Sequence, residues 1–273
     1  TNRASPVKIV DANVTQIACG YNHSLFLKTN GSLWAMGRND YGQLGDGSIT
    51  NRSTPVMVVG SGVKAITDSG HQSIYLKTDD TLWTTGYNVG GALGDGTTNN
   101  RSSFGQVATG VSSIGAGFAH TLFIKNDGTL WGMGFNSEGA LGDGSTTHRL
   151  SPVQITTGVT LVGGGNKNSR FIKSNGSLWA MGKNNNGQLG DGSTTQRNTP
   201  VQIEASGVSG FASGQEHSLF LKADGSLHAT GLNDVGQLGD GTTTDRSSPV
   251  QIQANGVASV YAGHKHSLYI KSD

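Results

Sequence analysis

Residues 33–47 read LWAMGRNDYGQLGDG, and this pattern of leucine, tryptophan, glycine, asparagine and aspartate returns four more times along the chain. The later copies begin at Leu82, Leu130, Leu178 and Leu227, which gives steps of 49, 48, 48 and 49 residues. Only the last copy breaks the aromatic position, with His228 in place of tryptophan. A repeat this regular predicts an array of one small structural unit, and a residue present in every copy is most simply explained by the architecture of that unit.

One unit, residues 63–107, contains four short apolar segments and no helical period. Val63–Ile66 is followed by Ser73–Lys77, a tight turn and Thr81–Thr85. The turn is Asp79-Asp80 here and Asn30-Gly31, Asp127-Gly128, Asn175-Gly176 or Asp224-Gly225 in the other copies. Asn-Gly and Asp-Gly between apolar runs indicate a hairpin, for which we expect positive φ at both turn residues.

A fourth strand is expected where Ser/Thr-Pro-Val-x-Ile recurs. It lies at Ser5–Ile9, Ser151–Ile155, Thr199–Ile203 and Ser248–Ile252, whereas Phe104-Gly105 stands in the place of Pro-Val in the second unit. Four short strands in about 45 residues, repeated in this way, are typical of propeller blades. The sequence therefore predicts an all-β fold, a β-propeller of repeated four-stranded blades.

The segment Ile17–Leu27, IACGYNHSLFL, resembles the signature of the regulator of chromosome condensation repeat family in its bacterial-type, short form. It recurs at Ile114–Ile124 and Phe211–Leu221, with a looser copy around His266, while Gln72 and Asn168 replace its histidine in two copies. The resemblance covers the whole chain. It implies a β-propeller, commonly of seven blades, that acts mostly through partners.

The number of blades follows from a recurring arginine. Its six copies are Arg3, Arg52, Arg101, Arg149, Arg197 and Arg246. The sixth unit is about 20 residues short and lacks its Leu-Trp strand and Gly-Asp-Gly loop. We therefore predict a single β-propeller domain over residues 1–273, with about six repeats and one composite blade made from the two termini; a fragment of a seven-bladed parent is the alternative.

The composition excludes several classes of protein. Hydrophobic residues make up 34% and charged residues 14% of the chain, which fits short strands joined by polar loops better than long charged helices. A net charge of +1 argues against a nucleic-acid partner, and no run of 18 apolar residues is present to span a membrane. Cys19 is the single cysteine, so no intrachain disulfide can form.

Rings of identical residues account for most chemically reactive side chains. The histidines His23, His120, His217 and His266 occur one per blade and are expected to be buried, with hydrogen bonds to neighbouring backbone. An aspartate precedes an arginine by six residues at Asp46/Arg52, Asp95/Arg101, Asp143/Arg149, Asp191/Arg197 and Asp240/Arg246, which favours an Asx turn or an ion pair. A lysine recurs at Lys28, Lys77, Lys125, Lys173, Lys222 and Lys271.

No arrangement typical of catalysis remains. Cys19 occupies a position that is Ala116 or Ser213 in other copies, so we expect a small buried residue there. Neither a nucleophile with a base nor a metal-ligand spacing is found. We therefore expect no catalytic residue, no metal site and no cofactor, and we expect that the protein is not an enzyme.

Positions that vary between copies are the candidates for recognition. The residues before the histidine and those after Leu-Trp-x-x-Gly both lie at the end of each hairpin opposite its turn, so they share one face of the propeller. The predicted partner-binding residues on this face are Tyr21, Arg38, Tyr41, Tyr87, Phe118, Phe135 and Glu138. Aromatic side chains on the loops of a rigid scaffold are typical anchors of protein interfaces, although some could only cover blade edges.

The leading hypothesis is a non-catalytic scaffold that binds a protein partner through this loop face. Enzyme inhibition is a special case, because one secreted relative of the resembled family inhibits β-lactamases. Guanine-nucleotide exchange on a small GTPase, as in the founding family member, is the first alternative, but the constant spacing leaves no room for the inserted wedge associated with it. A carbohydrate-binding module is the second alternative. We expect a monomer, and a secreted or cell-surface location is favoured over a cytoplasmic one.

Overall fold

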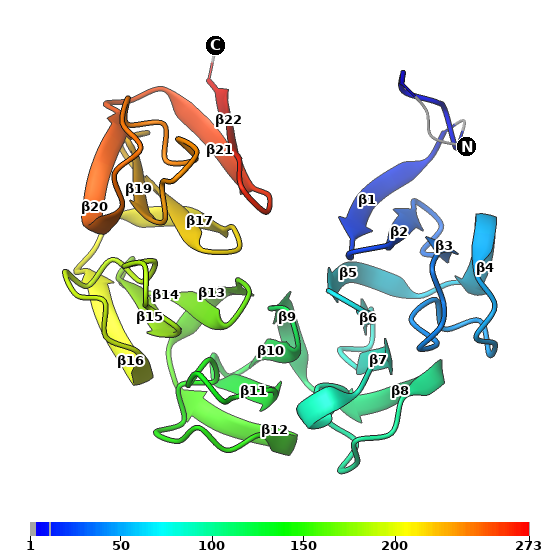
Figure 1. Cartoon of the computed structure of the whole chain (residues 1–273). Helices are drawn as coiled ribbons and strands as arrows, with labels where there is room; N and C mark the ends of the chain where they lie inside the picture. The colour runs from blue at the N-terminus through cyan, green and yellow to red at the C-terminus, as the bar shows by residue number, and fades with distance from the viewer. Residues whose placement is uncertain (1–3, 11, 273) are drawn as a thin grey trace.

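The computed structural model describes residues 4–10 and 12–272, and these residues form six antiparallel sheets placed as an open ring around a central axis (Figure 1). Five sheets have four strands each, paired in chain order, and the sixth has two. The first strand of every sheet lies nearest the axis and the fourth lies at the outer rim (Figure 1). This arrangement confirms the predicted all-β propeller of about six repeats.

The strand bounds repeat from sheet to sheet. They are β1 (Val14–Cys19), β2 (His23–Lys28), β3 (Leu33–Gly37) and β4 (Arg52–Val59); β5 (Val63–Ser69), β6 (Gln72–Lys77), β7 (Leu82–Gly86) and β8 (Arg101–Ala108); β9 (Val111–Ala116), β10 (His120–Lys125), β11 (Leu130–Gly134) and β12 (Arg149–Thr156); β13 (Val159–Gly164), β14 (Asn168–Lys173), β15 (Leu178–Gly182) and β16 (Arg197–Glu204); β17 (Val208–Ser213), β18 (His217–Lys222), β19 (Leu227–Gly231) and β20 (Arg246–Gln253); and β21 (Val257–Ala262) and β22 (Ser267–Lys271). The one helical segment among the described residues is a short 3₁₀ turn, η1 (Val89–Gly91). It is too short to cross a membrane, and no other helix is described.

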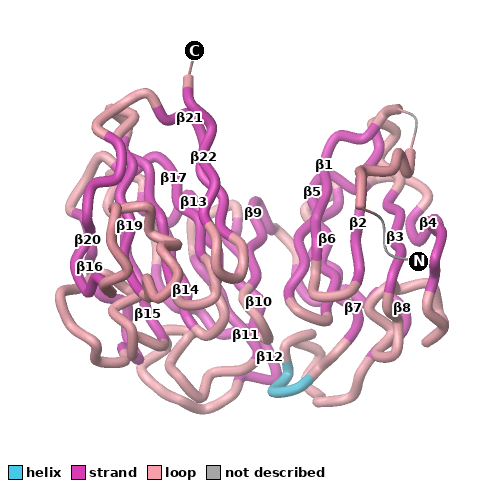
Figure 2. The backbone as a smooth tube through the Cα atoms, turned by 45° about the horizontal axis from the view of Figure 1, so that its top comes forward, coloured by secondary structure: helices cyan, strands magenta, loops and turns pink. Residues whose placement is uncertain are grey.

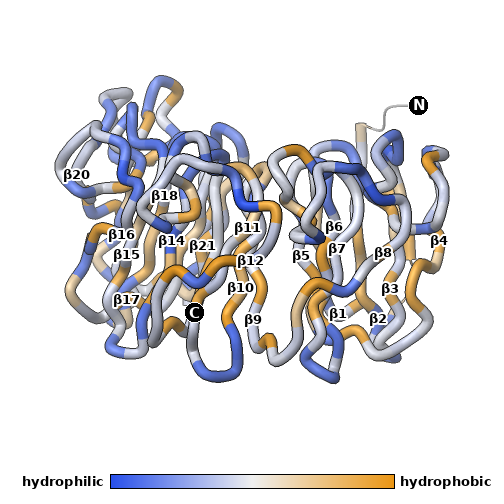
Figure 3. The backbone as a smooth tube through the Cα atoms, turned by 90° about the horizontal axis from the view of Figure 1, so that it is seen from below, coloured by the Kyte–Doolittle hydropathy of each residue, from blue (hydrophilic) through white to orange (hydrophobic). Residues whose placement is uncertain are grey.

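The hydrophobic core lies between neighbouring sheets. Leu25, Leu33 and Leu44 of the first sheet pack against Ile66 and Tyr75 of the second, and the same arrangement recurs around the ring. The second strands of the complete sheets are therefore largely buried on both faces, as in β6 and β10. The outer fourth strands contain both partly buried and exposed residues, and many hydrophilic segments lie in the loops at the two rims (Figure 3).

The composite blade predicted from the two termini is not formed. β22 pairs only with β21, and residues 4–10 form no strand. Every complete sheet pairs its fourth strand with its third, and the sequence contains no third strand for the sixth unit. The segment Ser5–Ile9 thus has no ladder to join, and a gap separates β21–β22 from β1 (Figure 2). Arg3, the first recurring arginine, lies outside the described residues.

The hairpin turns differ from the expected geometry. Only the second turn residue has positive φ at Gly31, Gly128, Gly176 and Gly225, with Asp80 in the same conformation. In the first copy the Gly31 N–H donates to the Lys28 carbonyl, and the Asn30 side chain accepts the Ser32 N–H at 3.0 Å. A three-residue hairpin loop with a type I turn and one left-handed residue explains this pattern. The prediction of positive φ at both turn residues was therefore wrong.

Three recurring histidines join one sheet to the next. His23 Nε2 is hydrogen-bonded to Ser73 Oγ at 3.0 Å, and the Ser73 hydroxyl donates its single proton to the Gln43 carbonyl at 2.6 Å. His120 and His217 make the same contact with Ser169 and Ser267. These three histidines are buried as predicted, and each bonds to a hydroxyl of the next sheet. The predicted backbone contact is also present for His23, with Gln72, and for His217, with His266. His266 itself is exposed.

The glycine three residues before each of these histidines leaves space for the imidazole ring. A Cβ on Gly20 would lie 2.3 Å from a ring carbon of His23, and one on Gly117 would lie 2.0 Å from His120. Burial lowers the pKa of the His120 imidazole to about 4. The ring therefore stays neutral at pH 7, and the Gly-x-x-His pattern belongs to the contact between blades.

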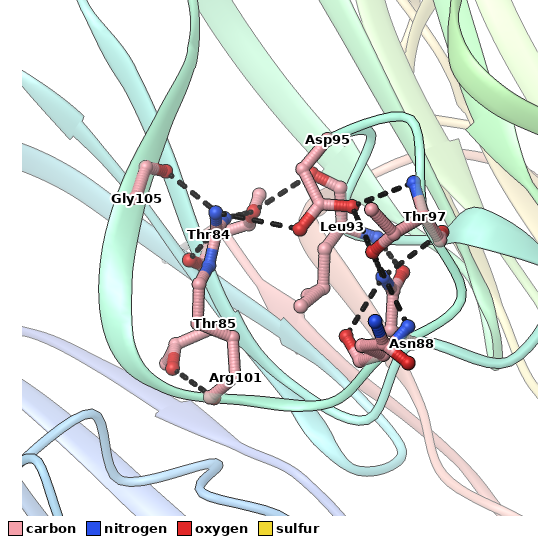
Figure 4. Close-up of polar contacts among 9 residues, drawn as sticks. Thr84, Thr85, Asn88, Leu93, Asp95, Thr97, Arg101 and Gly105 are labelled. Carbon is pink, nitrogen blue, oxygen red and sulfur yellow. Dashed lines mark hydrogen bonds and ion pairs between the residues drawn. The ribbon is translucent and has the colours of Figure 1, made fainter.

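The Gly-Asp-Gly loops are held by a buried asparagine (Figure 4). Asn88 Nδ2 donates to Asp95 Oδ1 at 3.2 Å and to the carbonyls of Thr97 and Asn99, while its Oδ1 accepts the Leu93 N–H at 2.8 Å. The predicted ion pairs form in all five loops, from 2.5 Å at Asp143–Arg149 to 3.4 Å at Asp95–Arg101. The recurring aspartates, asparagines and arginines are thus structural.

The recurring lysines contact aromatic side chains within their own sheets. In four sheets the lysine ammonium lies over the tryptophan of the third strand, as for Lys28 and Trp34 at 4.8 Å from Nζ to the ring centroid. The same tryptophan stacks on an aromatic ring of the second strand, with 6.0 Å between the Phe26 and Trp34 centroids. In the fifth sheet His228 stacks on Phe220, and Lys222 pairs with Glu204 instead.

We expect the substitution Asn184→Ala to destabilise the protein by about 3 kcal/mol, because Asn184 donates to Asp191 and to two carbonyls and accepts the Leu189 N–H in a fully buried position. Urea unfolding followed by circular dichroism measures the change. The adjacent Asn185 is exposed, so Asn185→Ala is the matched control and should change stability little. Equal effects of the two substitutions would contradict the structural role of the buried asparagine.

Candidate protein-binding face

Aromatic side chains from the first three sheets meet on the loop face, beside the central axis of the ring. The five side chains that we call the aromatic cluster are Tyr21, Tyr41, His71, Tyr87 and Phe118. Neighbouring ring centroids lie 5.2 Å apart for Tyr21–Phe118, 5.5 Å for Tyr21–His71, 5.3 Å for Tyr41–His71 and 4.7 Å for Tyr41–Tyr87. Residues separated by up to 97 positions in the chain thus form one continuous group of rings.

Main-chain hydrogen bonds hold the loops that carry these rings. The Tyr21 N–H donates to the Gly70 carbonyl of the next sheet at 2.9 Å, and the Tyr87 N–H donates to the His71 carbonyl at 3.0 Å. The Tyr41 N–H donates to the Gln43 side chain at 2.9 Å. Tyr21 is 53% exposed although its backbone is fixed. The cluster is therefore an ordered, partly exposed surface.

Arg38 joins the aromatic cluster at its edge. Its guanidinium lies 5.6 Å from the Tyr41 ring centroid and forms an ion pair with Asp40, with 2.7 Å between Nε and Oδ2. Partial burial, followed by the positive charge of Arg38, lowers the pKa of His71 below its ordinary value. The centre of the cluster is thus uncharged at pH 7, with the Arg38–Asp40 ion pair at its rim.

The remaining two predicted residues, Phe135 and Glu138, form a separate group. Lys167 contacts both of them, with its Nζ 5.6 Å from the Phe135 ring centroid and 3.6 Å from Glu138 Oε1. His148 stacks on Phe135 at 4.6 Å between centroids. The structure therefore brings together four of the seven predicted residues with His71 and places Arg38 beside them, whereas no ring contact joins Phe135 to this cluster among the described residues.

The same face is polar over the fourth and fifth sheets. Glu216 accepts hydrogen bonds from Lys183 at 2.7 Å and Gln188 at 2.6 Å, and Lys265 pairs with Asp234 at 2.9 Å. Beneath Glu216, the fully buried Arg170 donates to Asn168 at 2.9 Å, to Ser213 at 3.1 Å and to the Gln188 carbonyl. Burial lowers the pKa of Arg170 to about 9. Aromatic and charged side chains thus divide the face into two halves.

A cavity of about 400 Å³ opens on the axis, lined by residues from all six sheets, including Tyr21 and Phe118 of the aromatic cluster. One equivalent position of the innermost strands contributes Cys19, Asp68, Ala116, Gly164, Ser213 and Ala262. Asp68 is the one carboxylate of this set, and its Oδ2 is buried without a hydrogen-bond partner among the described residues. Burial raises the pKa of Asp68 to about 7.

Cys19 lies in this cavity wall and is exposed, so the expectation of a buried cysteine was wrong. A small side chain is tolerated there because the innermost strand borders the axial cavity, rather than because neighbouring sheets enclose it. Sequence reasoning also missed Asp68 and Arg170 and gave His71 no special role. The sequence did contain a signal, because each of these residues differs from the residues at the equivalent position of the other repeats. Arg170, for example, stands where other repeats have Leu25 or Leu219.

The histidine–serine contacts do not form a catalytic pair. Ser73 is completely buried, and its hydroxyl proton is already donated to a backbone carbonyl. The contact recurs at three sheet boundaries, as His23–Ser73, His120–Ser169 and His217–Ser267. The arrangement supports packing between sheets, because a reactive serine would need an accessible hydroxyl.

Comparisons with known proteins agree with the fold. The family model described as RCC1-like domain matches residues 1–269. Human WBSCR16 superposes with a TM-score of 0.85 at 23% identity, over 95% of this chain and 72% of that chain. Yeast RCC1 (Prp20), solved bound to Kap60, superposes with a TM-score of 0.82 at 20% identity, over 94% of this chain and 68% of that chain. At these identities the two structures are similar to this chain in fold alone.

The raised pKa of Asp68 predicts a pH-dependent stability. The folded state holds the proton up to about pH 7 and the unfolded chain releases it near pH 4, so stability from this group falls as the pH rises through that interval. Asp68→Asn should match the unmodified protein near pH 4 and exceed its stability by about 4 kcal/mol at pH 8, because each unit of pKa difference corresponds to about 1.4 kcal/mol. Urea unfolding at both pH values measures the difference. A difference that does not change with pH would show that the carboxyl ionises normally.

Proposed function

The chain belongs to the RCC1-like domain family, and from that premise we propose that it is a non-catalytic propeller that binds a protein partner through the aromatic cluster. The observation that supports this proposal is the continuous group of rings formed by Tyr21, Tyr41, His71, Tyr87 and Phe118 across three sheets. Large aromatic side chains at the centre of an interface supply most of its binding energy.

The fixed backbone of the cluster favours tight binding. Because the loops are tied to neighbouring sheets by main-chain hydrogen bonds, binding would cost little additional conformational entropy. Tyrosine hydroxyl groups and the Arg38 guanidinium add polar contacts at the edge, which are typical of interface rims. Phe135 and Glu138, with Lys167, would contact only a partner large enough to reach the third sheet's outer loops. An enzyme whose active site is covered by this face is one such partner.

Nucleotide exchange is tested separately. A structure of yeast Prp20 is described together with its binding to Gsp1p and histones, but that protein is 16% identical to this chain, so the likeness carries the fold alone. The loops between the third and fourth strands keep nearly constant length in all five complete sheets, and none projects as an inserted wedge. Release of fluorescent GDP from a panel of small GTPases, measured with and without the protein, distinguishes exchange activity from simple binding.

Replacing Tyr41, Tyr87 and Phe118 together with alanine should reduce capture of the partner about tenfold or more, because the central rings of the interface are removed. Capture is measured by affinity purification from the source cells with quantitative mass spectrometry. Tyr261→Ala is the matched control, since Tyr261 is 55% exposed and lies outside the aromatic cluster. Unchanged capture by the folded triple variant, checked by its thermal unfolding midpoint, would reject this face as the binding site.

A further inference from the structure

The axial cavity holds one carboxylate that has no partner. Asp68 of β5 lines the cavity, and its Oδ2 is buried without a hydrogen-bond partner among the described residues. The fold does not require an acid at this position, because the equivalent positions of the other five sheets carry small residues without a carboxyl group, namely Cys19, Ala116, Gly164, Ser213 and Ala262. We propose that Asp68 and the rings of Tyr21 and Phe118 form a pocket for the side chain of a lysine on the protein partner, an inference that rests on the proposed function.

Contacts between the first two sheets fix the place of Asp68. The Gln16 side chain of β1 donates to the Ile66 carbonyl at 3.1 Å and accepts the Ile66 N–H at 3.0 Å, two residues before Asp68 on β5. At the loop end, the Tyr21 N–H donates to the Gly70 carbonyl at 2.9 Å, two residues after Asp68. The strands β1, β5 and β9 lie side by side around the axis (Figure 1). The wall of the pocket is therefore built by three consecutive sheets and is ordered without a ligand.

The two rings lie nearer the loop face than the carboxyl group does. Tyr21 and Phe118 belong to the loops after β1 and β9, and each stands two residues beyond the position equivalent to Asp68. Two residues of extended strand span about 7 Å. A lysine side chain has an apolar stem of four carbons and a charged tip, and such stems bury against apolar surface. The rings, whose centroids are 5.2 Å apart, thus suit the stem, while Asp68 suits the tip.

The chemistry of the cavity favours an ammonium group over other cations. A guanidinium bonds best to both oxygens of a carboxylate, whereas the protein encloses Oδ2 of Asp68. A metal ion needs several ligands, and no group of three His, Cys, Asp or Glu side chains that could hold one is found in the described part of the chain. An ammonium is a compact charge that can donate to a single carboxylate oxygen, and aromatic faces also attract it.

A bound ammonium would offset the cost of burying this carboxylate. Burial raises the pKa of Asp68 to about 7, and no charged side chain contributes to that shift. An opposite charge within about 4–6 Å favours the ionised form of a carboxyl group. Other carboxylates of the same face already have a cation, since Glu216 pairs with Lys183 and Asp234 pairs with Lys265. Asp68 therefore gains more from a cation of the partner than they do.

The probe for this pocket is Nα-acetyl-lysine N-methylamide, titrated into the 273-residue protein at pH 7. Backbone amide NMR signals of residues 67–70 should shift saturably at millimolar concentrations, because a single side chain makes few contacts. The matching norleucine compound has the same four-carbon stem without the ammonium group and should not produce these shifts. Equal shifts from the two compounds, or none from the lysine compound, would overturn the proposal.

Two protein variants test the carboxylate. Asp68→Asn should weaken binding of the lysine compound about tenfold or more, because an amide leaves the ammonium without an opposite charge. Asp127→Asn is the matched control, since it removes the same charge from a hairpin turn where other repeats have Asn30 and Asn175, and it should leave the affinity unchanged. Because Asp68→Asn is expected to stabilise the fold, weaker binding by this variant cannot result from unfolding. Equal affinities for the two variants would contradict the role of Asp68.

Capture of the partner separates this inference from the proposed function. Asp68→Asn should reduce capture about threefold or more, whereas Asp127→Asn should not. The double variant Tyr41→Ala with Tyr87→Ala alters the aromatic cluster at residues that do not line the cavity. Loss of capture by the double variant but not by Asp68→Asn would overturn the lysine pocket and leave the proposed function intact. Unchanged capture by both would overturn the pocket and the binding face together.

Discussion

Each sheet of this chain has two apolar faces, and neither face can be buried without a neighbouring sheet. The second strands of the complete sheets are largely buried on both sides, and core clusters join residues of adjacent sheets. The histidine–serine–carbonyl contact, in which His23, Ser73 and Gln43 take part, fixes how one sheet meets the next. Everything on the loop face depends on this packing, because it brings the ends of successive hairpins toward one axis.

Departures from the repeat show how the packing tolerates change. In the fourth sheet Asn168 replaces the histidine and Arg170 replaces a leucine, and the two new side chains bond to each other. Arg170 also reaches Ser213 of the fifth sheet, so a polar contact still crosses the boundary between sheets. In the second sheet Gln72 replaces the histidine and donates to the Tyr87 carbonyl, which helps to position a loop of the aromatic cluster. The substitutions therefore preserve the architecture while changing the surface above it.

The division of the loop face into an aromatic half and a charged half has a physical consequence. Ring contacts over the first three sheets present apolar area with little net charge, whereas Glu216 and its neighbours satisfy one another through hydrogen bonds. A partner gains most by covering side chains that have no strong alternative partner, and these are the rings.

The sequence by itself determined the repeat, the strands, the hairpins and the Asp–Arg pairs, because these depend on contacts within one unit of 48 or 49 residues. It also placed Tyr21, Tyr41, Tyr87 and Phe118 on one face, since strand alternation and hairpin geometry are local. Only the tertiary structure decided that these rings meet around His71, that Phe135 contacts Lys167, and that Asp68 and Cys19 line an axial cavity. It also decided that the ring stays open at β22. The reason is that these features join residues of different units, and their distances depend on the angle between packed sheets, which no pattern within one unit encodes.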